Sequence, residues 1–395
     1  MNCIFSIKPI YIFLFSVVLM VSTGSCKSNS HEATFELLAK EPIVQIELDS
    51  LTSNVSNWLS FFYDAEQDSG LVFSIDNDQN ELELYSLESG GLVSKLKFEE
   101  QGPAGVGKLS AISILALDSI LIFPPFTNEY LGVNLATKTL KKGEFQKPDG
   151  FSSINSQTRF FRSIPFLKDN YLYTKTLFGG NYLLLENEEL SGKPLMYRVD
   201  LSDGAVEFSK FTFPDDYWAD GKRHYEFSSA LNDNQLVFSF HSDHNIYYGV
   251  SFDEPLKKKL AKSKYLSQKF EDLPLGNDAN ARRGYFATTG HYGNLLYDQF
   301  RDVYYRFCYP KKEVEKDEDL RELVMFPQEF SVMILNSELD VIGETLLGNN
   351  DDKYAASNAF VGPKGLYISV NHPKSELNRE EIFGFQLFTL DIKAQ

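Results

Sequence analysis

The stretch from Gly70 to Phe98, "GLVFSIDNDQNELELYSLESGGLVSKLKF", carries the pattern that decides the fold. Three short runs rich in β-branched and aromatic residues alternate apolar with polar side chains, and "DNDQN" and "ESGG" separate them. Asp, Asn, Ser and Gly favour tight turns, whereas the runs favour pleated strands. No run has the 3.6-residue spacing of an amphipathic helix. The stretch therefore predicts three antiparallel strands joined by hairpin turns.

The same combination of a polar turn and an apolar strand recurs along the chain. With the first stretch it occurs six times, roughly 50 to 70 residues apart, and further strands follow most copies, as in "FSVMILNSELDVIGETLL". The five later copies are "ALDSILIF" (116–123), "FLKDNYLYTK" (166–175), "ALNDNQLVFSF" (230–240), "GHYGNLLYD" (290–298) and "VGPKGLYISV" (361–370). Repeats that carry several strands each are typical of β-propeller blades.

We therefore predict an all-β chain whose residues 35–395 form a β-propeller of six blades. A pair of irregular β-sandwiches is the alternative, because short strands at regular spacing also suit sandwiches. Seven or eight blades stay open if "IVQIELDS" (43–50) helps to close the ring. The charged stretch 309–329, "YPKKEVEKDEDLRELVMFPQE", is expected to be a helical or disordered insert between two strands.

The composition suits a globular β-protein and disfavours a nucleic-acid partner. Hydrophobic residues make up 43% of the 395 residues, and the aromatic share of 14%, with 33 Phe and 21 Tyr, favours strands. The formal net charge is −17. Proteins bind nucleic acids through clustered Lys and Arg, so this charge argues against such a partner.

The first 25 residues are expected to be a signal peptide. Lys8 precedes an apolar run from Ile10 to Val21, and small residues then lead to Cys26. "TGSC" resembles a bacterial lipoprotein box, so we expect Cys26 to be lipidated and residues 26–34 to form a polar tether. Thr23 departs from the commoner aliphatic residue, and an ordinary signal peptide or an N-terminal membrane anchor is the alternative.

The expected address is the cell envelope, with the membrane as a partner through the lipid. No acidic run follows Lys27 closely, which favours an outer-membrane lipoprotein that faces the periplasm over surface exposure. Cys3 would leave with the signal peptide, so Cys308 is the remaining thiol. It is expected to be a buried apolar side chain and not a nucleophile.

The motif "GPAGVGK" from Gly102 to Lys108 matches most of a phosphate-binding loop. Such a loop places Ser or Thr directly after its lysine and opens a helix. Here Leu109 follows the lysine, and the β-branched residues after it favour a strand. We therefore expect no nucleotide and no other cofactor, and the glycines are expected to let the backbone turn between blades.

Two motifs suggest metal ligands, and both fail on their spacing. Asp76, Asp78 and Asn80 alternate as calcium ligands do, but Glu81 stands where the calcium loop needs glycine. A hairpin turn explains them better, although calcium at another acidic loop stays open. His241 and His244 in "HSDH" would point to opposite faces of a strand, so no metal site is expected.

No catalytic signature is present, since the sequence contains neither H-E-x-x-H nor G-x-S-x-G. The most distinctive segment is "RRGYFATTGHYGNLLYDQFRDVYYRFCYP" from Arg282, whose second half predicts a hairpin. A basic and aromatic cluster within so acidic a chain suggests an anionic or sugar ligand. The candidate ligand-binding residues are Arg282, Arg283, His291 and Tyr292. The alternative is that the arginines pair with carboxylates and the tyrosines are core.

The lipoprotein start, "GPAGVG" and "HYGNLLYDQFRDVYYRF" together resemble a family of Bacteroidota lipoproteins, domain of unknown function 4221. They are also similar, more loosely, to six-bladed propeller lipoproteins of the same bacteria. The resemblance implies a propeller at the cell envelope from about Phe35 onward, and it implies no activity and no catalytic residue.

These observations together favour a lipid-anchored binding or scaffolding module for a peptide, a glycan or an envelope protein. An enzyme that cleaves polysaccharide on the propeller face is one alternative, and a structural subunit of an envelope complex is another.

Overall fold

The computed structural model describes residues 34–56, 58–102, 105–109, 111–124, 127–137, 139–146, 148–151, 159–232, 235–276, 278–315, 318–348 and 352–393. They belong to one unit, Thr34–Gln395. The expected signal peptide (1–25), the expected lipidation site Cys26 and the tether up to residue 33 lie outside the described residues.

The described residues form 24 strands, which pair in antiparallel runs of four along the chain. Four runs are separate sheets: β2 (Ser60–Asp64), β3 (Ser69–Asp76), β4 (Glu81–Ser86) and β5 (Leu92–Lys97); β6 (Ala111–Ala116), β7 (Ser119–Phe123), β8 (Glu129–Asn134) and β9 (Thr139–Glu144); β10 (Phe166–Lys168), β11 (Tyr171–Lys175), β12 (Met196–Asp200) and β13 (Val206–Phe208); β14 (Phe227–Leu231), β15 (Leu236–Phe240), β16 (Asn245–Gly249) and β17 (Lys257–Leu260).

The other eight strands form one sheet in the order β18-β19-β20-β21-β1-β24-β23-β22. Its strands are β18 (His291–Asp298), β19 (Val303–Tyr309), β20 (Phe330–Asn336), β21 (Val341–Leu347), β1 (Phe35–Glu47), β24 (Ile382–Ile392), β23 (Gly365–Ser369) and β22 (Ala355–Gly362). A single parallel pair, Phe35 with Gly343, joins its two halves.

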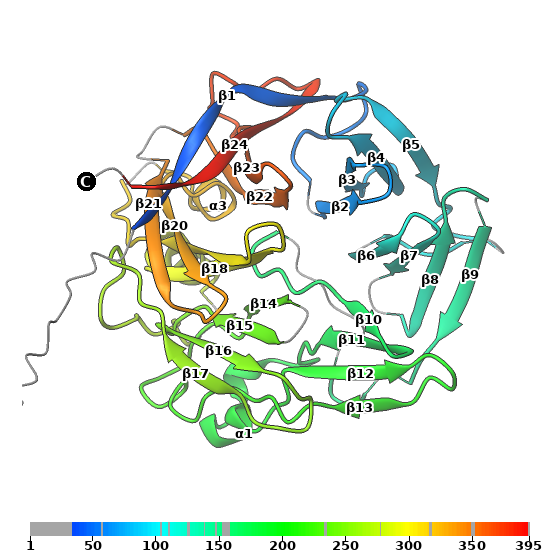
Figure 1. The fold of residues 1–395 in the computed structure, drawn as a ribbon. Coiled ribbons are helices and arrows are strands. Elements are labelled where there is room, and N and C mark those ends of the chain that lie inside the picture. The colour runs from blue at the N-terminus through cyan, green and yellow to red at the C-terminus, as the bar shows by residue number, and fades with distance from the viewer. Residues whose placement is uncertain are drawn as a thin grey trace, which may run out of the picture. The chain divides into compact units, whose positions relative to one another are not determined.

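The sheets surround a common centre like the blades of a propeller (Figure 1). The first strand of each run, namely β2, β6, β10, β14, β18 or β22, lies innermost, and contacts link these inner strands around the centre. Second strands such as β3, β7 and β15 are buried on both faces, whereas outer strands such as β5 are half exposed. Burial on both faces explains why β7 and β15 are apolar over most of their length.

The core consists of six hydrophobic clusters in the described residues, and each one fills the space between two neighbouring runs of strands. One of them packs β19 and β20 against β22 to β24, through residues such as Phe307, Phe330 and Ile368. The two halves of the eight-stranded sheet therefore pack face to face, as two blades do.

Strand β1 closes the ring. It runs antiparallel to β24, from Phe35 opposite Ile392 to Glu47 opposite Ile382. The residues of "IVQIELDS" (43–50) therefore help to close the ring, but they complete the last run of four strands instead of adding a seventh blade.

The predicted β-propeller class is confirmed, and so are the three strands and two turns within Gly70–Phe98. The number of separate four-stranded sheets in the described residues is four and not six, because edge strands β1 and β21 pair and merge the last two runs. In five of the six repeats the quoted strand is the second of its run; "GHYGNLLYD" is instead the first strand, β18.

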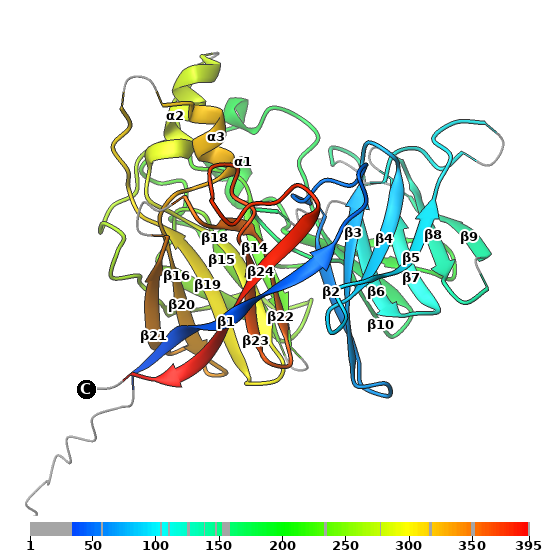
Figure 2. The ribbon, with the colours of Figure 1, turned by 90° about the horizontal axis from the view of Figure 1, so that it is seen from above.

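The long connections and all the helices lie on one face, which we call the loop face, and short hairpin turns form the opposite turn face (Figure 2). The helices are η1 (Tyr182–Leu184), α1 (Asn187–Ser191), α2 (Ala279–Thr288) and α3 (Leu320–Met325). Helix α3 lies within the predicted insert 309–329. Among the described residues, no helix has the length and apolar character that crossing a bilayer requires.

Candidate binding site in the central channel

The inner strands enclose a cavity of about 430 Å³ in the centre of the ring. Every one of the six inner strands contributes to its wall, from Ser60 in β2 to Val361 in β22. Exposed Gln299 and Leu231 form part of the wall, so the cavity reaches the surface at the turn face. Its volume lies in the range of pockets that hold small organic ligands.

Small polar side chains join neighbouring inner strands around the channel. The Ser163 hydroxyl lies 2.6 Å from that of Ser229, and the Ser228 hydroxyl donates to the carbonyl of Gly293 at 3.0 Å. Ser113 donates to the carbonyl of Pro165 in the same way. These groups are satisfied within the protein, so they hold the blades together and leave the wall of the cavity well defined.

Arg162 is a buried charged residue in the wall of this cavity. Its exposed fraction is 6%. Its backbone N–H donates to Asn294 Oδ1 at 2.9 Å, and its Nη2 donates to the carbonyl of Leu59, next to β2, at 3.4 Å. The side chain thus reaches from the segment before β10 to the segment before β2. Burial lowers the pKa of Arg162 to about 10, so the group remains a cation at neutral pH.

Half-buried aromatic rings form much of the remaining wall. Phe61 stacks on Phe360 with ring centres 5.0 Å apart, which links β2 to β22. Tyr63 meets Phe300 edge to face at 5.3 Å, and the Tyr63 hydroxyl donates to Asp68 at 2.5 Å. Aromatic faces bind flat apolar groups and sugar rings well. The cavity therefore combines a buried cation with an aromatic wall.

Three histidines pack together on the loop face. His241 is fully buried, and its ring stacks on that of His291 with centres 4.6 Å apart. His224 meets His241 edge to face at 5.1 Å and packs on Phe161 and Phe286. We call His224, His241 and His291 the histidine cluster. His291 Nδ1 lies 2.8 Å from the carbonyl of Thr289 and is therefore its protonated nitrogen.

Acidification is expected to destabilise the protein through the histidine cluster. Burial lowers the pKa of His224 and of His291 to about 4, and that of His241 well below its usual value. Between pH 6.5 and 4 the unfolded chain binds more protons than the folded protein, so stability is full above pH 6.5 and falls as the pH drops. The loss at pH 5 is about 2 kcal/mol for each group with a pKa near 4.

Urea unfolding at pH 8, 7, 6 and 5 measures this loss. The free energy of unfolding should be flat from pH 8 to 7 and then fall, and His224→Phe should weaken the fall. Lys175 and Glu226, which pair at 2.6 Å, lie near His224 and are left unchanged in this variant. Equal stability at pH 7 and 5 would show that the cluster titrates normally.

The structure separates the four binding residues that the sequence suggested. Arg282 and Arg283 lie in α2, where Arg283 Nη1 donates to Asn280 Oδ1 at 2.9 Å. His291 belongs to the histidine cluster and lines a second cavity of about 280 Å³ beside α2. Tyr292 is fully buried on the other side of β18 and belongs to the core between the runs that contain β15 and β18.

Tyr292 has a complete set of partners within the core. Its hydroxyl accepts from the Ser263 N–H at 3.0 Å and lies 2.8 Å from His244 Nδ1. The guanidinium of Arg306 lies 3.3 Å from the centre of its ring. Cys308, which lies in β19 as Arg306 does, carries a free and buried thiol. Burial raises the pKa of this thiol. This half of the distinctive segment therefore holds the core together.

The phosphate-loop-like motif connects two blades. After Leu109 the chain enters β6 and not a helix, and positive φ angles at Gly102 and Gly107 turn the backbone. Asn80 fixes this connection, because its Nδ2 donates to the Gly107 carbonyl and its Oδ1 accepts from the Leu109 N–H. Pro103 and Ala104 of the motif lie outside the described residues.

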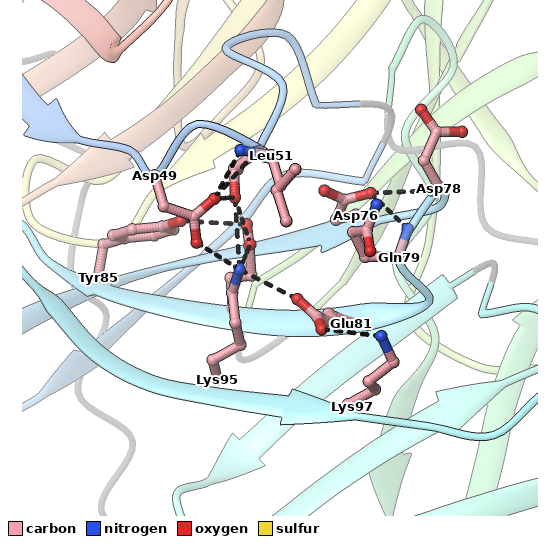
Figure 3. Close-up of polar contacts among 11 residues, drawn as sticks. Asp49, Leu51, Asp76, Asp78, Gln79, Glu81, Tyr85, Lys95 and Lys97 are labelled. Atoms are coloured by element: carbon pink, nitrogen blue, oxygen red, sulfur yellow. Dashed lines mark hydrogen bonds and ion pairs between the residues drawn. The ribbon is translucent and has the colours of Figure 1, made fainter.

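The calcium-like residues form the turn between β3 and β4. Asp76 Oδ1 accepts from the N–H groups of Asp78 and Gln79, at 2.8 and 3.0 Å, which is a turn stabilised by its own aspartate (Figure 3). The side chains of His241 and His244 pack on different residues: the His241 ring stacks on that of His291, whereas His244 Nδ1 lies 2.8 Å from the Tyr292 hydroxyl. In the part of the chain that the structure describes, no three His, Cys, Asp or Glu residues are arranged to hold a metal ion.

A buried ionic network lies where the chain passes from β1 to β2, over β4 and β5 (Figure 3). Lys95 Nζ contacts Asp49 at 2.8 Å, Glu81 at 3.0 Å and Glu83 at 2.9 Å. Burial alone would lower the pKa of Lys95, but hydrogen bonds to these carboxylates raise it well above its usual value. The bond from Lys95 holds the pKa of Asp49 near 2.

Glu83 is the innermost carboxylate of this network and has no exposed surface. It also accepts hydrogen bonds from the hydroxyl groups of Thr52 at 2.7 Å and Tyr85 at 3.1 Å. All its partners are supplied by the chain itself, so the network binds the β1–β2 connection to its blade and is not a candidate ligand site.

Sequence reasoning did not single out Arg162 or His224, and it considered His241 only as a metal ligand together with His244. Arg162 stands in "FFRSIPF" (160–166), a stretch without a recognisable motif. Its place in the channel depends on which segment of the chain becomes innermost. The three histidines come from three separate segments. Only the alternation of β18 could have warned that adjacent His291 and Tyr292 face opposite ways.

Comparison with known proteins identifies a family and several similar folds. The family model described as "Domain of unknown function (DUF4221)" matches residues 34–346. The crystal structure of a DUF4221 member from Bacteroides vulgatus is similar with a TM-score of 0.80 and 21% identity, and the match covers 92% of this chain and 100% of that chain.

More distant structures share less of the fold. A Bacteroides fragilis protein thought to be exported has a TM-score of 0.53 and 10% identity, over 91% of this chain and 96% of that chain. Virginiamycin B lyase from Staphylococcus aureus, in a structure with quinupristin, has a TM-score of 0.43 and 11% identity, and the match covers 89% of this chain and 99% of that chain. A similarity this low says nothing about the function of this chain. The comparison with curated proteins gave no match.

Proposed function

The chain belongs to the family of domain of unknown function 4221, and from that premise we propose that it is a binding module whose ligand enters the central channel. The observation that carries this proposal is the cavity of about 430 Å³, to which every inner strand contributes. A site built from six strands keeps a fixed shape, because each strand is held by hydrogen bonds to the next strand of its sheet. Such preformed clefts are the usual binding sites of small ligands.

The charges and rings of the wall support binding more than structural filling. A core that served packing alone would place apolar side chains in the channel centre, whereas this one holds the guanidinium of Arg162 there. The half-buried rings of Tyr63 and Phe300 near the turn face also offer apolar area to a ligand.

We extend the proposal to the address of the protein. Lipidation of Cys26 would tether the propeller to a membrane of the cell envelope, where the channel would meet a glycan fragment, a peptide or part of a protein partner. Radiolabelled palmitate tests the anchor: incorporation into the protein, and its loss in Cys26→Ser, would support it. Incorporation that survives Cys26→Ser would contradict it.

Thermal melting with a panel of envelope glycans and peptides tests the binding proposal. A ligand at 100 times its dissociation constant stabilises the folded state by about 2.7 kcal/mol, which raises the melting temperature measurably. A ligand recovered intact supports a binding module, and a ligand recovered cleaved favours the enzymatic alternative. A panel without any shift would count against a small ligand in the channel.

A pair of matched variants locates the site of any ligand that binds. Leu231 is 39% exposed at the end of β14 and lines the cavity, whereas Leu260 is 66% exposed in β17, the outer strand of the same sheet. Leu231→Trp should change the affinity at least threefold, and Leu260→Trp should leave it unchanged. Equal affinities in both variants would place the ligand outside the channel.

A further inference from the structure

We infer that the channel takes a small monoanionic ligand with a flat apolar body, which enters from the turn face and places its anionic group at Arg162. This inference rests on the proposed function, because it names the ligand class of that same cavity. It draws on three features of the cavity: the position of the cation, the chemistry of the wall and the charge of the rim.

The cation lies deep within the cavity. Arg162 is anchored at both ends, by its backbone bonds to Asn294 and Ser229 and by the contact of its Nη2 with the Leu59 carbonyl. A guanidinium fixed in this way acts on an anion through a medium of low polarity, where the attraction between opposite charges is stronger than in water. Carboxylates fit the planar donors of arginine especially well.

The wall beyond Arg162 selects a flat apolar body. Phe62 and Phe166 line the cavity from β2 and β10, and Tyr297 lines it from β18; all three are half buried. Each ring also packs within the protein, as Phe166 does on Tyr173 with ring centres 4.8 Å apart, and a planar ligand would cover the part that lines the channel in offset or edge-to-face contact. An anion without an apolar body would leave this surface exposed to water.

The rim of the channel, formed by the turns between the first and second strands of the runs, is acidic on balance and disfavours long polyanions. Its exposed side chains include Asp68, Asp118, Asp169 and Asp302 against Lys168 and Lys364. These negative charges, on a chain of net charge −17, repel a polymer that carries an anion at every unit. A ligand with one anionic group, inserted with that group first, avoids them. An acidic rim around a buried cation therefore favours a monoanion.

Calorimetric titration with two matched probes tests this inference. The probes are 2-naphthoate and its neutral amide, 2-naphthamide, which have nearly the same shape and apolar area. We expect the carboxylate to bind the wild-type protein at least tenfold more tightly than the amide, because charge-assisted hydrogen bonds are about twice as strong as neutral ones. In Arg162→Met this preference should disappear.

The outcomes separate the inference from the proposed function. If both probes bind equally and Leu231→Trp changes both affinities, the channel binds ligands but the anionic class is wrong. If neither probe binds at millimolar concentration, the inference that the ligand is a flat monoanion is wrong. The melting experiment with envelope glycans and peptides then decides the proposed function. Arg162→Lys, which keeps the charge, should retain a preference for the carboxylate. If Arg162→Met fails to fold, the wild-type comparison of the two probes and Arg162→Lys still decide.

Discussion

Replacing Lys95 by methionine is expected to lower the free energy of unfolding by about 3 kcal/mol, because the change leaves buried carboxylates without their cation. Glu83 has no exposed surface, and Lys95 contacts it together with Glu81 and Asp49. The methionine side chain matches the length of the lysine stem, so the loss would come from charge and not from packing. Urea unfolding at pH 7 measures the difference.

Lys97→Met is the matched control for this variant. Lys97 lies in the same strand β5 and also pairs with Glu81, at 3.6 Å, but its side chain is 60% exposed. An exposed pair of this kind contributes at most about 1 kcal/mol.

The Lys95→Met protein should regain stability when Glu83→Gln is added, since the glutamine removes the unpaired negative charge at position 83. Equal losses in the two lysine variants would show that the network is not essential.

Replacing Gly343 by alanine is expected to cost about 2 kcal/mol, through a clash between two blades. A Cβ atom at this position would lie 2.1 Å from the carbonyl oxygen of Phe35 and 2.8 Å from its carbonyl carbon. Gly343 pairs with Phe35 where β21 meets β1, and this register pair merges the last two runs of strands in one sheet. The start of β1 would have to move away from β21, so the closure of the ring would weaken.

Gly284→Ala provides the opposite expectation with the same change. Gly284 lies within helix α2, and nothing stands within 4 Å of its added Cβ. Alanine is favoured over glycine in a helix by up to about 1 kcal/mol, so this variant should be slightly more stable than the wild type. Thermal melting of the two variants side by side measures the contrast. A Gly343→Ala protein as stable as Gly284→Ala would contradict the ring closure described above.

Local chemistry made the strands predictable from the sequence. The turns "DNDQN" and "ESGG" and the alternation between them depend on neighbouring residues only, and the structure confirms β3, β4 and β5 there. The closure of the ring was harder to predict. Whether "IVQIELDS" adds a blade or completes one depends on its partner, β24, more than 300 residues away.

The site was predictable only in small part. Arg282 and Arg283 drew attention as a basic pair, but they lie in a helix, α2, that begins at an Asp278 cap and that the sequence pattern did not predict. His291 and Tyr292 are adjacent in the sequence and face opposite ways, because side chains alternate along β18. Arg162 shows no motif at all. Its place in the wall of the channel follows from the convergence of the inner strands, which local patterns do not encode.

A crystal structure of the protein soaked with 2-naphthoate tests the central claim most directly, because it shows where the ligand lies. The account predicts the carboxylate beside the guanidinium of Arg162 and the ring system between Phe62 and Phe166 in the central channel. A ligand found outside the channel, or an empty channel at a concentration at which calorimetry detects binding, would contradict it.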